Sequence, residues 1–175
     1  LYQQAITENG VSAAGVQSGP NPAGNIYAGG MIYDSGNDMA YVTGITYEES
    51  TGGETVASSC FVTEIDMIDW TWDTTTVLGT STVLESCQAL GMVEQTTLVV
   101  IGNSEPTGLL SNDNNKMTGF SIALDKHKLT ELSGLALKTS IASKIPFPTN
   151  IVTHLDNIYI VALTSTDDEL SSAYT

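Results

Sequence analysis

The chain repeats itself with a period of about 59 residues, and this repeat constrains its fold more than any other feature. The segment CFVTEIDMIDWTWDT at residues 60–74 returns as GFSIALDKHKLTELS at residues 119–133. Phe61 in the first segment corresponds to Phe120 in the second. A unit of this length buries its apolar surface by stacking on its neighbours, so the period indicates a repeat architecture.

A second landmark recurs with nearly the same period. Apolar runs end in a small residue at Gly44, Gly102 and Ala162. The line that contains Phe61 also has a counterpart one period earlier, at Tyr2. The sequence therefore predicts one array of three repeats, at about residues 1–59, 60–118 and 119–175.

Each repeat has the pattern of four short β-strands. β-Branched and aromatic residues fill the predicted strands, whereas Gly, Asn, Asp and Ser fill the joins between them. A four-stranded sheet of this size cannot bury both faces alone, so neighbouring sheets must stack around an axis. We therefore expect an all-β fold, a partial β-propeller or a segment of one, with about three four-stranded antiparallel blades. Further blades, from the same protein or from another chain, would be needed because propellers have about four blades or more.

The repeat resembles the SBBP-type β-propeller repeat. Copies of that repeat run from a Gly into an apolar strand, a Gly-Asn turn, a Tyr-Val-Thr-Gly strand, and a Phe-Val strand that leads to a Trp. The corresponding elements here are residues 30–34, Gly36 with Asn37, residues 41–44, residues 61–66, and Trp70. The resemblance implies an extracellular or cell-surface β-propeller used for binding and assembly, and it brings no catalytic motif.

Charge narrows the range of partners. The chain has 5 Lys and Arg residues against 20 Asp and Glu residues, for a net charge of −15. Nucleic acids and anionic membranes are bound through Lys and Arg, so we expect neither as a partner. We expect no insertion into a membrane either, because no apolar stretch approaches the ~20 residues of a membrane span. The expected partners are other protein chains or further blades of the same protein.

The two cysteines give information about the redox state of the compartment in which the protein resides. Cys60 and Cys87 suit one disulfide in an oxidising compartment, although two free thiols in a reducing compartment fit the same count. A bridge would pin a blade to its own connecting segment. The scarcity of Lys, the absence of Arg and the abundance of Thr, Ser, Gly and Asp favour the secretory route. We expect an extracellular or cell-surface location, with an organelle lumen as the alternative.

Calcium is the cofactor that the sequence suggests. The turn DSGND offers oxygen ligands from Asp34, Asn37 and Asp38, and the loop at residues 112–115 offers more. Carboxylate and amide oxygens suit a hard cation, but a hydrated polar turn has the same composition.

A tryptophan pair is a candidate ligand platform. Trp70 and Trp72 point the same way on a predicted strand and are flanked by Asp69 and Asp73, a pairing seen in carbohydrate sites. Packing between blades is the alternative interpretation.

Carboxylates are the candidates for catalysis. Asp66, Glu85 and Asp125 are the nominees for a glycosidase-like pair. Asp66 and Asp125 occupy the same repeat position before a hairpin, where an Asp side chain caps a turn, so we expect them to be structural. His127 and His154 have no Cys nearby, and we predict no catalytic or zinc site from them.

The sequence thus predicts a non-catalytic structural and protein-interaction module of an acidic secreted or cell-surface protein, acting within a larger assembly. The alternatives are a glycan-binding propeller module and a carboxylate-dependent glycan hydrolase.

Overall fold

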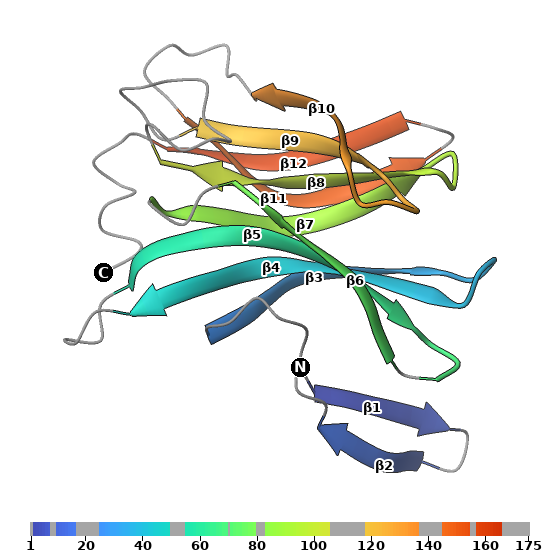
Figure 1. Cartoon of the computed structure of the whole chain (residues 1–175). Helices are drawn as coiled ribbons and strands as arrows, with labels where there is room; N and C mark the ends of the chain where they lie inside the picture. The colour runs from blue at the N-terminus through green and yellow to red at the C-terminus, as the bar shows by residue number, and fades with distance from the viewer. Residues whose placement is uncertain are drawn as a thin grey trace.

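The computed structural model of the chain is all-β (Figure 1). It describes residues 2–7, 10–16, 25–49, 55–69, 71–79, 83–105, 118–136, 145–154 and 157–165. The strands in these ranges are β1 (Tyr2–Thr7), β2 (Gly10–Val16), β3 (Asn25–Asp34), β4 (Met39–Glu49), β5 (Thr55–Asp66), β6 (Thr71–Leu78), β7 (Glu85–Val93), β8 (Thr97–Ser104), β9 (Thr118–Asp125), β10 (Glu131–Ala136), β11 (Ile145–His154) and β12 (Asn157–Ser165). In this part of the chain no helix is long and apolar enough to cross a membrane.

Two four-stranded antiparallel sheets form the centre of the molecule. The first sheet has the strand order β3-β4-β5-β6, and the second sheet has the order β10-β9-β8-β7. Strands that follow one another in the chain are neighbours in both sheets, as in a meander. The pairs β1–β2 and β11–β12 each form a two-stranded antiparallel sheet, named here the N-terminal hairpin and the C-terminal hairpin.

The sheets do not begin where the sequence repeats were expected to begin. The stretch predicted as the second repeat, residues 60–118, supplies the last strands of the first sheet and the first strands of the second. The described residues therefore form two four-stranded sheets and two hairpins instead of three complete blades. Sequence similarity gives the period of a repeat but not its starting point, which hydrogen bonding between strands determines.

The two hairpins correspond to opposite halves of a sheet. Tyr2 in β1 lies one repeat period before Phe61 in β5, so the N-terminal hairpin corresponds to the outer pair β5–β6. Ala162 in β12 lies close to one period after Gly102 in β8, so the C-terminal hairpin corresponds to the inner pair β7–β8.

The three inner pairs share one irregularity. A single extra residue interrupts the register of the first strand, at Gly29 in β3, Gln88 in β7 and Thr149 in β11. Such a β-bulge bends its strand and increases the local twist. The bulges recur with nearly the period of the sequence repeat, which supports the equivalence of β3, β7 and β11.

The bulges explain the glycine that ends two of the three apolar runs. Gly44 and Gly102 lie opposite the bulges of their sheets. A Cβ atom on Gly44 would collide with the carbonyl oxygen of Tyr27, and one on Gly102 would collide with that of Ser86. The inner strand comes so close here that no ordinary side chain fits.

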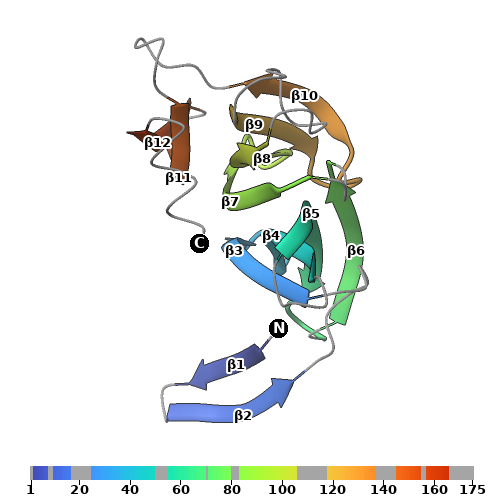
Figure 2. The ribbon, with the colours of Figure 1, turned by 90° about the vertical axis from the view of Figure 1, so that its left-hand side faces the viewer.

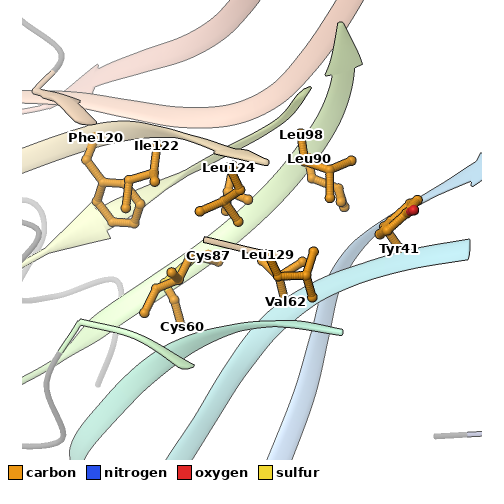
Figure 3. Close-up of a cluster of buried hydrophobic side chains, with 12 residues drawn as sticks. Tyr41, Cys60, Val62, Cys87, Leu90, Leu98, Phe120, Ile122, Leu124 and Leu129 are labelled. Carbon is orange, nitrogen blue, oxygen red and sulfur yellow. A yellow bond between two sulfur atoms is a disulfide. The ribbon is translucent and has the colours of Figure 1, made fainter. Parts of the chain in front are cut away.

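The main hydrophobic cluster lies between the first and second sheets (Figure 3). Phe120, Ile122 and Leu124 come from β9 of the second sheet, and Cys60 and Val62 come from β5 of the first. All five are buried. Because full burial of one large apolar side chain contributes about 1.5–3 kcal/mol, this cluster is the main source of cohesion between the sheets.

The second sheet also buries its other face. There Val99 and Ile101 pack in one cluster with Ile151 of β11 and Ile160 of β12. The second sheet is thus enclosed between the first sheet and the C-terminal hairpin. Figure 2 shows the inner strands β3, β7 and β11 close together and the outer strands β6 and β10 at the periphery.

A disulfide crosses the interface between the two sheets. Cys60 in β5 is bonded to Cys87 in β7, with their Cα atoms 5.2 Å apart, and both side chains are buried. The expectation that a bridge would pin a blade to its own connecting segment is wrong, because β5 and β7 belong to different sheets. The bridge joins neighbouring sheets directly.

Loss of the disulfide should destabilise the chain. We expect reduction to lower the free energy of unfolding by about 3 kcal/mol, because the bridge restrains the unfolded chain over a separation of 27 residues. Urea unfolding followed by circular dichroism, with and without a reductant, measures the change. The variant Cys60→Ala/Cys87→Ala should lose a similar amount and should not respond to reductant. Equal stability of the oxidised and reduced chains would contradict the prediction.

Candidate functional site

A buried ion pair joins the two sheets at one end of their interface. Lys126 lies in the turn between β9 and β10 of the second sheet, and Asp34 is the last residue of β3 in the first sheet. The Lys126 Nζ atom lies 2.6 Å from the Asp34 Oδ2 atom, and both side chains are buried. A charge-assisted contact of this kind is strong and specific, because each charge would be costly to bury alone.

Asp34 is also held by its own turn. Its Oδ1 atom accepts a hydrogen bond of 3.0 Å from the backbone N–H of Gly36, and its Oδ2 atom accepts one of 2.8 Å from the Asn37 side chain. Lys126, and then Asn37, hold the pKa of the Asp34 carboxyl at about 2, below its ordinary value. The carboxylate is therefore ionised and fully engaged at neutral pH.

A capped turn places Lys126. The Asp125 Oδ1 atom accepts hydrogen bonds from the backbone N–H groups two and three residues further on, and Asp66 does the same in the first sheet, at 2.8–3.1 Å. The Lys126 backbone N–H donates to the carbonyl oxygen of Thr96, at 2.9 Å. The prediction that these two aspartates cap turns is confirmed. Their carboxylates are structural.

Sequence reasoning missed Lys126. The equivalent position one repeat period earlier is Met67, so the lysine is not part of the repeat. The signal was available: one of only 5 basic residues replaces an apolar residue of the other copy. A departure from the repeat at a turn is where a contact specific to one pair of sheets would be found.

The turn predicted to bind calcium brings its three residues together. Asp34 is engaged by Lys126, and the Asp38 Oδ1 atom accepts a hydrogen bond from the Tyr33 hydroxyl. Among the residues described, no three or more His, Cys, Asp or Glu side chains are grouped so as to hold a metal ion. The loop at residues 112–115 lies outside the described ranges. Calcium at residues 34–38 stays a prediction, and Lys126 accounts for the buried carboxylate without a metal.

A second buried pair lies in the first sheet, near the same turn. The Tyr41 hydroxyl donates a hydrogen bond of 3.0 Å to Glu64 Oε1, and both residues are buried. Burial raises the pKa of Glu64, while the Tyr41 hydrogen bond and the charges of His127 and Lys126 oppose this shift. Burial also raises the pKa of Tyr41. Both side chains are buried in this conformation and are closed to a substrate.

Glu85 lies at the opposite end of the interface between the first and second sheets. Its side chain is fully buried, and its Oε1 atom accepts a hydrogen bond of 3.0 Å from the Ser104 hydroxyl. The Ser58 hydroxyl donates to the Glu85 carbonyl oxygen at 2.7 Å and accepts from its backbone N–H at 3.0 Å. A carboxylate without exposed surface cannot contact a glycan in this conformation. The Glu85 backbone therefore serves the contact between β5 and β7, and its carboxylate bonds within the second sheet.

The tryptophan platform is described only in part. Trp72 in β6 is half-buried and packs against a cluster on the first sheet, on the face away from the second sheet. Trp70 lies outside the described residues. The carbohydrate platform stays a prediction, and Trp72 has a packing role. The cluster consists of Ala40, Val42, Phe61 and Ile65.

The three bulges line a groove. It has a volume of about 430 Å³ and lies where residues 29–32 of β3, 88–90 of β7 and 149–151 of β11 converge. Its lining includes the polar residues Gln88, Thr149 and Asn150 but no acidic or basic side chain. The groove offers hydrogen bonds and apolar contacts, and its lining holds no group for acid–base catalysis.

Removal of the Lys126 side chain should leave the buried Asp34 carboxylate without its counter-charge. We expect Lys126→Met to lower the free energy of unfolding by about 3–5 kcal/mol, because breaking a buried pair leaves Asp34 uncompensated. The matched control is Lys128→Met, an exposed lysine of the same turn, which should change little. Urea unfolding of both variants measures the difference. Equal effects of the two substitutions would refute the role given to Lys126.

The same pair should give an acid-sensitive contribution to stability. The folded-state pKa of Asp34 is about 2 and its ordinary value is 3.8, so the contribution is present above about pH 3.8 and is lost as the pH falls toward 2. We expect the difference in unfolding free energy between the wild type and Asp34→Asn to shrink across this window. Urea unfolding of both proteins at each pH measures it. The subtraction cancels the contribution of Glu64, whose pKa moves in the opposite direction. A difference independent of pH would contradict the prediction.

Comparison with known proteins gives no relative from which a function could be inferred: no protein-family model and no curated protein matches the chain.

Proposed function

We propose that the chain is a non-catalytic structural and protein-interaction module, a segment of a β-propeller in an acidic secreted or cell-surface protein. Its sheets bind further sheets of the same kind and so build a larger assembly. The observation that carries this proposal is the bare apolar face of the C-terminal hairpin.

That face can be compared with its counterpart in the second sheet. Tyr159 and Val161 in β12 are 55% and 53% exposed. The equivalent residues of the preceding unit, Val99 and Ile101 in β8, are 5% and 0% exposed, because the C-terminal hairpin covers them. Val152 in β11 adds to the exposed face. Positions that are buried in the second sheet are therefore exposed in the C-terminal hairpin. This difference supports a role of the exposed face in binding another sheet.

The C-terminal hairpin also has an open edge. In the complete sheets, the second strand pairs on both sides, β4 with β3 and β5, and β8 with β7 and β9. Within the described ranges, β12 pairs with β11 alone. An unpaired strand edge is a template for further pairing. The open edge of β12 is suited to hydrogen bonding with an outer pair of strands. The exposed apolar face of the C-terminal hairpin is suited to packing against a further sheet.

The propeller architecture is supported by how the sheets meet. The second sheet buries both faces, the inner strands lie together, and each inner pair has the same bulge. Stacking of this kind around an axis is the packing of propeller blades. A secreted location is supported by the buried disulfide, since disulfides persist in oxidising compartments.

The glycan alternatives have less support. Asp66 and Asp125 cap turns, and Glu85 is buried. A glycan-binding role would appear as a change in tryptophan fluorescence on addition of oligosaccharides. Glycan hydrolysis that disappears in Glu85→Gln while stability is retained would favour the hydrolase instead.

An extended chain tests the proposed function. Residues 116–136, which contain β9 and β10, are appended after Thr175. The link between β12 and the added strands then nearly matches the length of the link between β8 and β9. We expect the added pair to dock on β12, raise the midpoint of thermal unfolding by several degrees and increase the strand signal in circular dichroism.

The control carries the same extension with Ile122→Asp and Leu124→Asp in the added copy. It should leave the midpoint unchanged, because charged residues cannot occupy the apolar positions of an outer strand. If the two extended chains unfold at the same temperature, β12 does not accept an outer strand pair and the proposed architecture is wrong.

A further inference from the structure

The opposite side of the molecule has a complementary open face. Met31 and Tyr33 in β3 are 66% and 47% exposed on the side of the first sheet that faces away from the second. Their equivalents in the next unit are Leu90, which is 6% exposed, and Met92. Both equivalents pack into the cluster between the two sheets. On β3, the first sheet therefore leaves exposed two positions that the second sheet uses to pack on its predecessor, whereas Val42 and Phe61 on the same face are buried.

The strand pairs are complementary as well. The N-terminal hairpin corresponds to an outer pair, and the C-terminal hairpin corresponds to an inner pair. Within the described residues, β1 pairs with β2 alone and β12 with β11 alone. Placed side by side as β11-β12-β1-β2, they reproduce the order of the first sheet, β3-β4-β5-β6.

We propose that a second copy of this chain is the partner of the C-terminal hairpin. Resting on the function proposed above, this inference names the partner: the second copy adds its β1–β2 pair to the edge of β12 and packs its Met31–Tyr33 surface on Tyr159 and Val161. The contact is head to tail, so each copy offers one surface of each kind.

Two copies joined in this way close a ring. The described residues of each copy contribute two complete sheets, and each of the two contacts completes one more from a C-terminal and an N-terminal hairpin. The ring then has six four-stranded sheets, within the roughly four to eight blades of known propellers. Among the described residues, the closed ring covers the exposed apolar surfaces of β3 and β12 and the open edge of β12, which is why two copies are preferred over an open chain of copies.

Charge sets the conditions for this association. Each copy has a net charge of −15, so two copies repel one another at low ionic strength. The joined surfaces are apolar faces and backbone hydrogen bonds, which salt does not weaken. We therefore expect association to strengthen as salt is raised to about 0.5 M and screens the repulsion.

Light scattering after size exclusion, with the oxidised chain at micromolar concentration in high salt, provides the test. The expected mass is twice the 18.5 kDa of one chain. Met31→Glu and Val161→Glu each change one exposed residue of one surface, so each should fold normally and remain a monomer. Thermal unfolding of both variants checks the fold. The exposed Leu132→Glu on β10 is the matched control and should form the dimer.

A mixture of the two monomeric variants distinguishes a head-to-tail contact from a symmetric one. Met31→Glu retains an intact C-terminal surface, and Val161→Glu retains an intact N-terminal surface, so together they should form a one-to-one pair through one good contact. A monomer at high salt, growth of the wild type beyond two copies, or dimers in either variant alone would overturn the proposal. A monomeric wild type whose extended form gains stability would leave the proposed function standing and refute only the second copy.

Discussion

A β-sheet with apolar residues on both faces is stable only between two neighbours, and this constraint governs the whole molecule. The second sheet meets it fully: one face packs on the first sheet and the other on the C-terminal hairpin. The first sheet and the C-terminal hairpin meet it only in part, because Met31 and Tyr33 on β3 and Tyr159 and Val161 on β12 are exposed on their outward faces. Their exposed apolar residues are explained by this position in the stack, since equivalent residues inside the stack are buried. The function proposed for the chain is thus a consequence of how its core is built.

Within the stack, apolar packing is not specific about alignment, because one alternating strand resembles another. The polar contacts at the two ends of the interface supply that specificity. Lys126 reaches Asp34 at one end, and Glu85 meets Ser58 at the other. A relative shift of the sheets would separate the buried Lys126 and Asp34 charges and leave each without its counter-charge, at a cost of several kcal/mol. We regard these contacts as the determinants of register between the sheets.

The sequence predicted the elements better than their grouping. Strand positions, the turn-capping role of Asp66 and Asp125, and the importance of Gly44 and Gly102 follow from the repeat, because each reflects local backbone geometry. The division into sheets does not follow, since a periodic pattern has no preferred starting point. The same ambiguity misplaced the disulfide within one blade. Lys126 was missed because repeat analysis emphasises what recurs, while a contact made once depends on what does not.

The disulfide has a consequence for how the chain responds to mechanical force. Cys60 and Cys87 enclose β6 and the link to the second sheet in a covalent loop. Tension applied along the backbone passes from β5 to β7 through the sulfur atoms, so β6 transmits none of it. A chain pulled through its termini would keep this strand in place, and the interface between its two sheets would stay closed until the bridge was reduced.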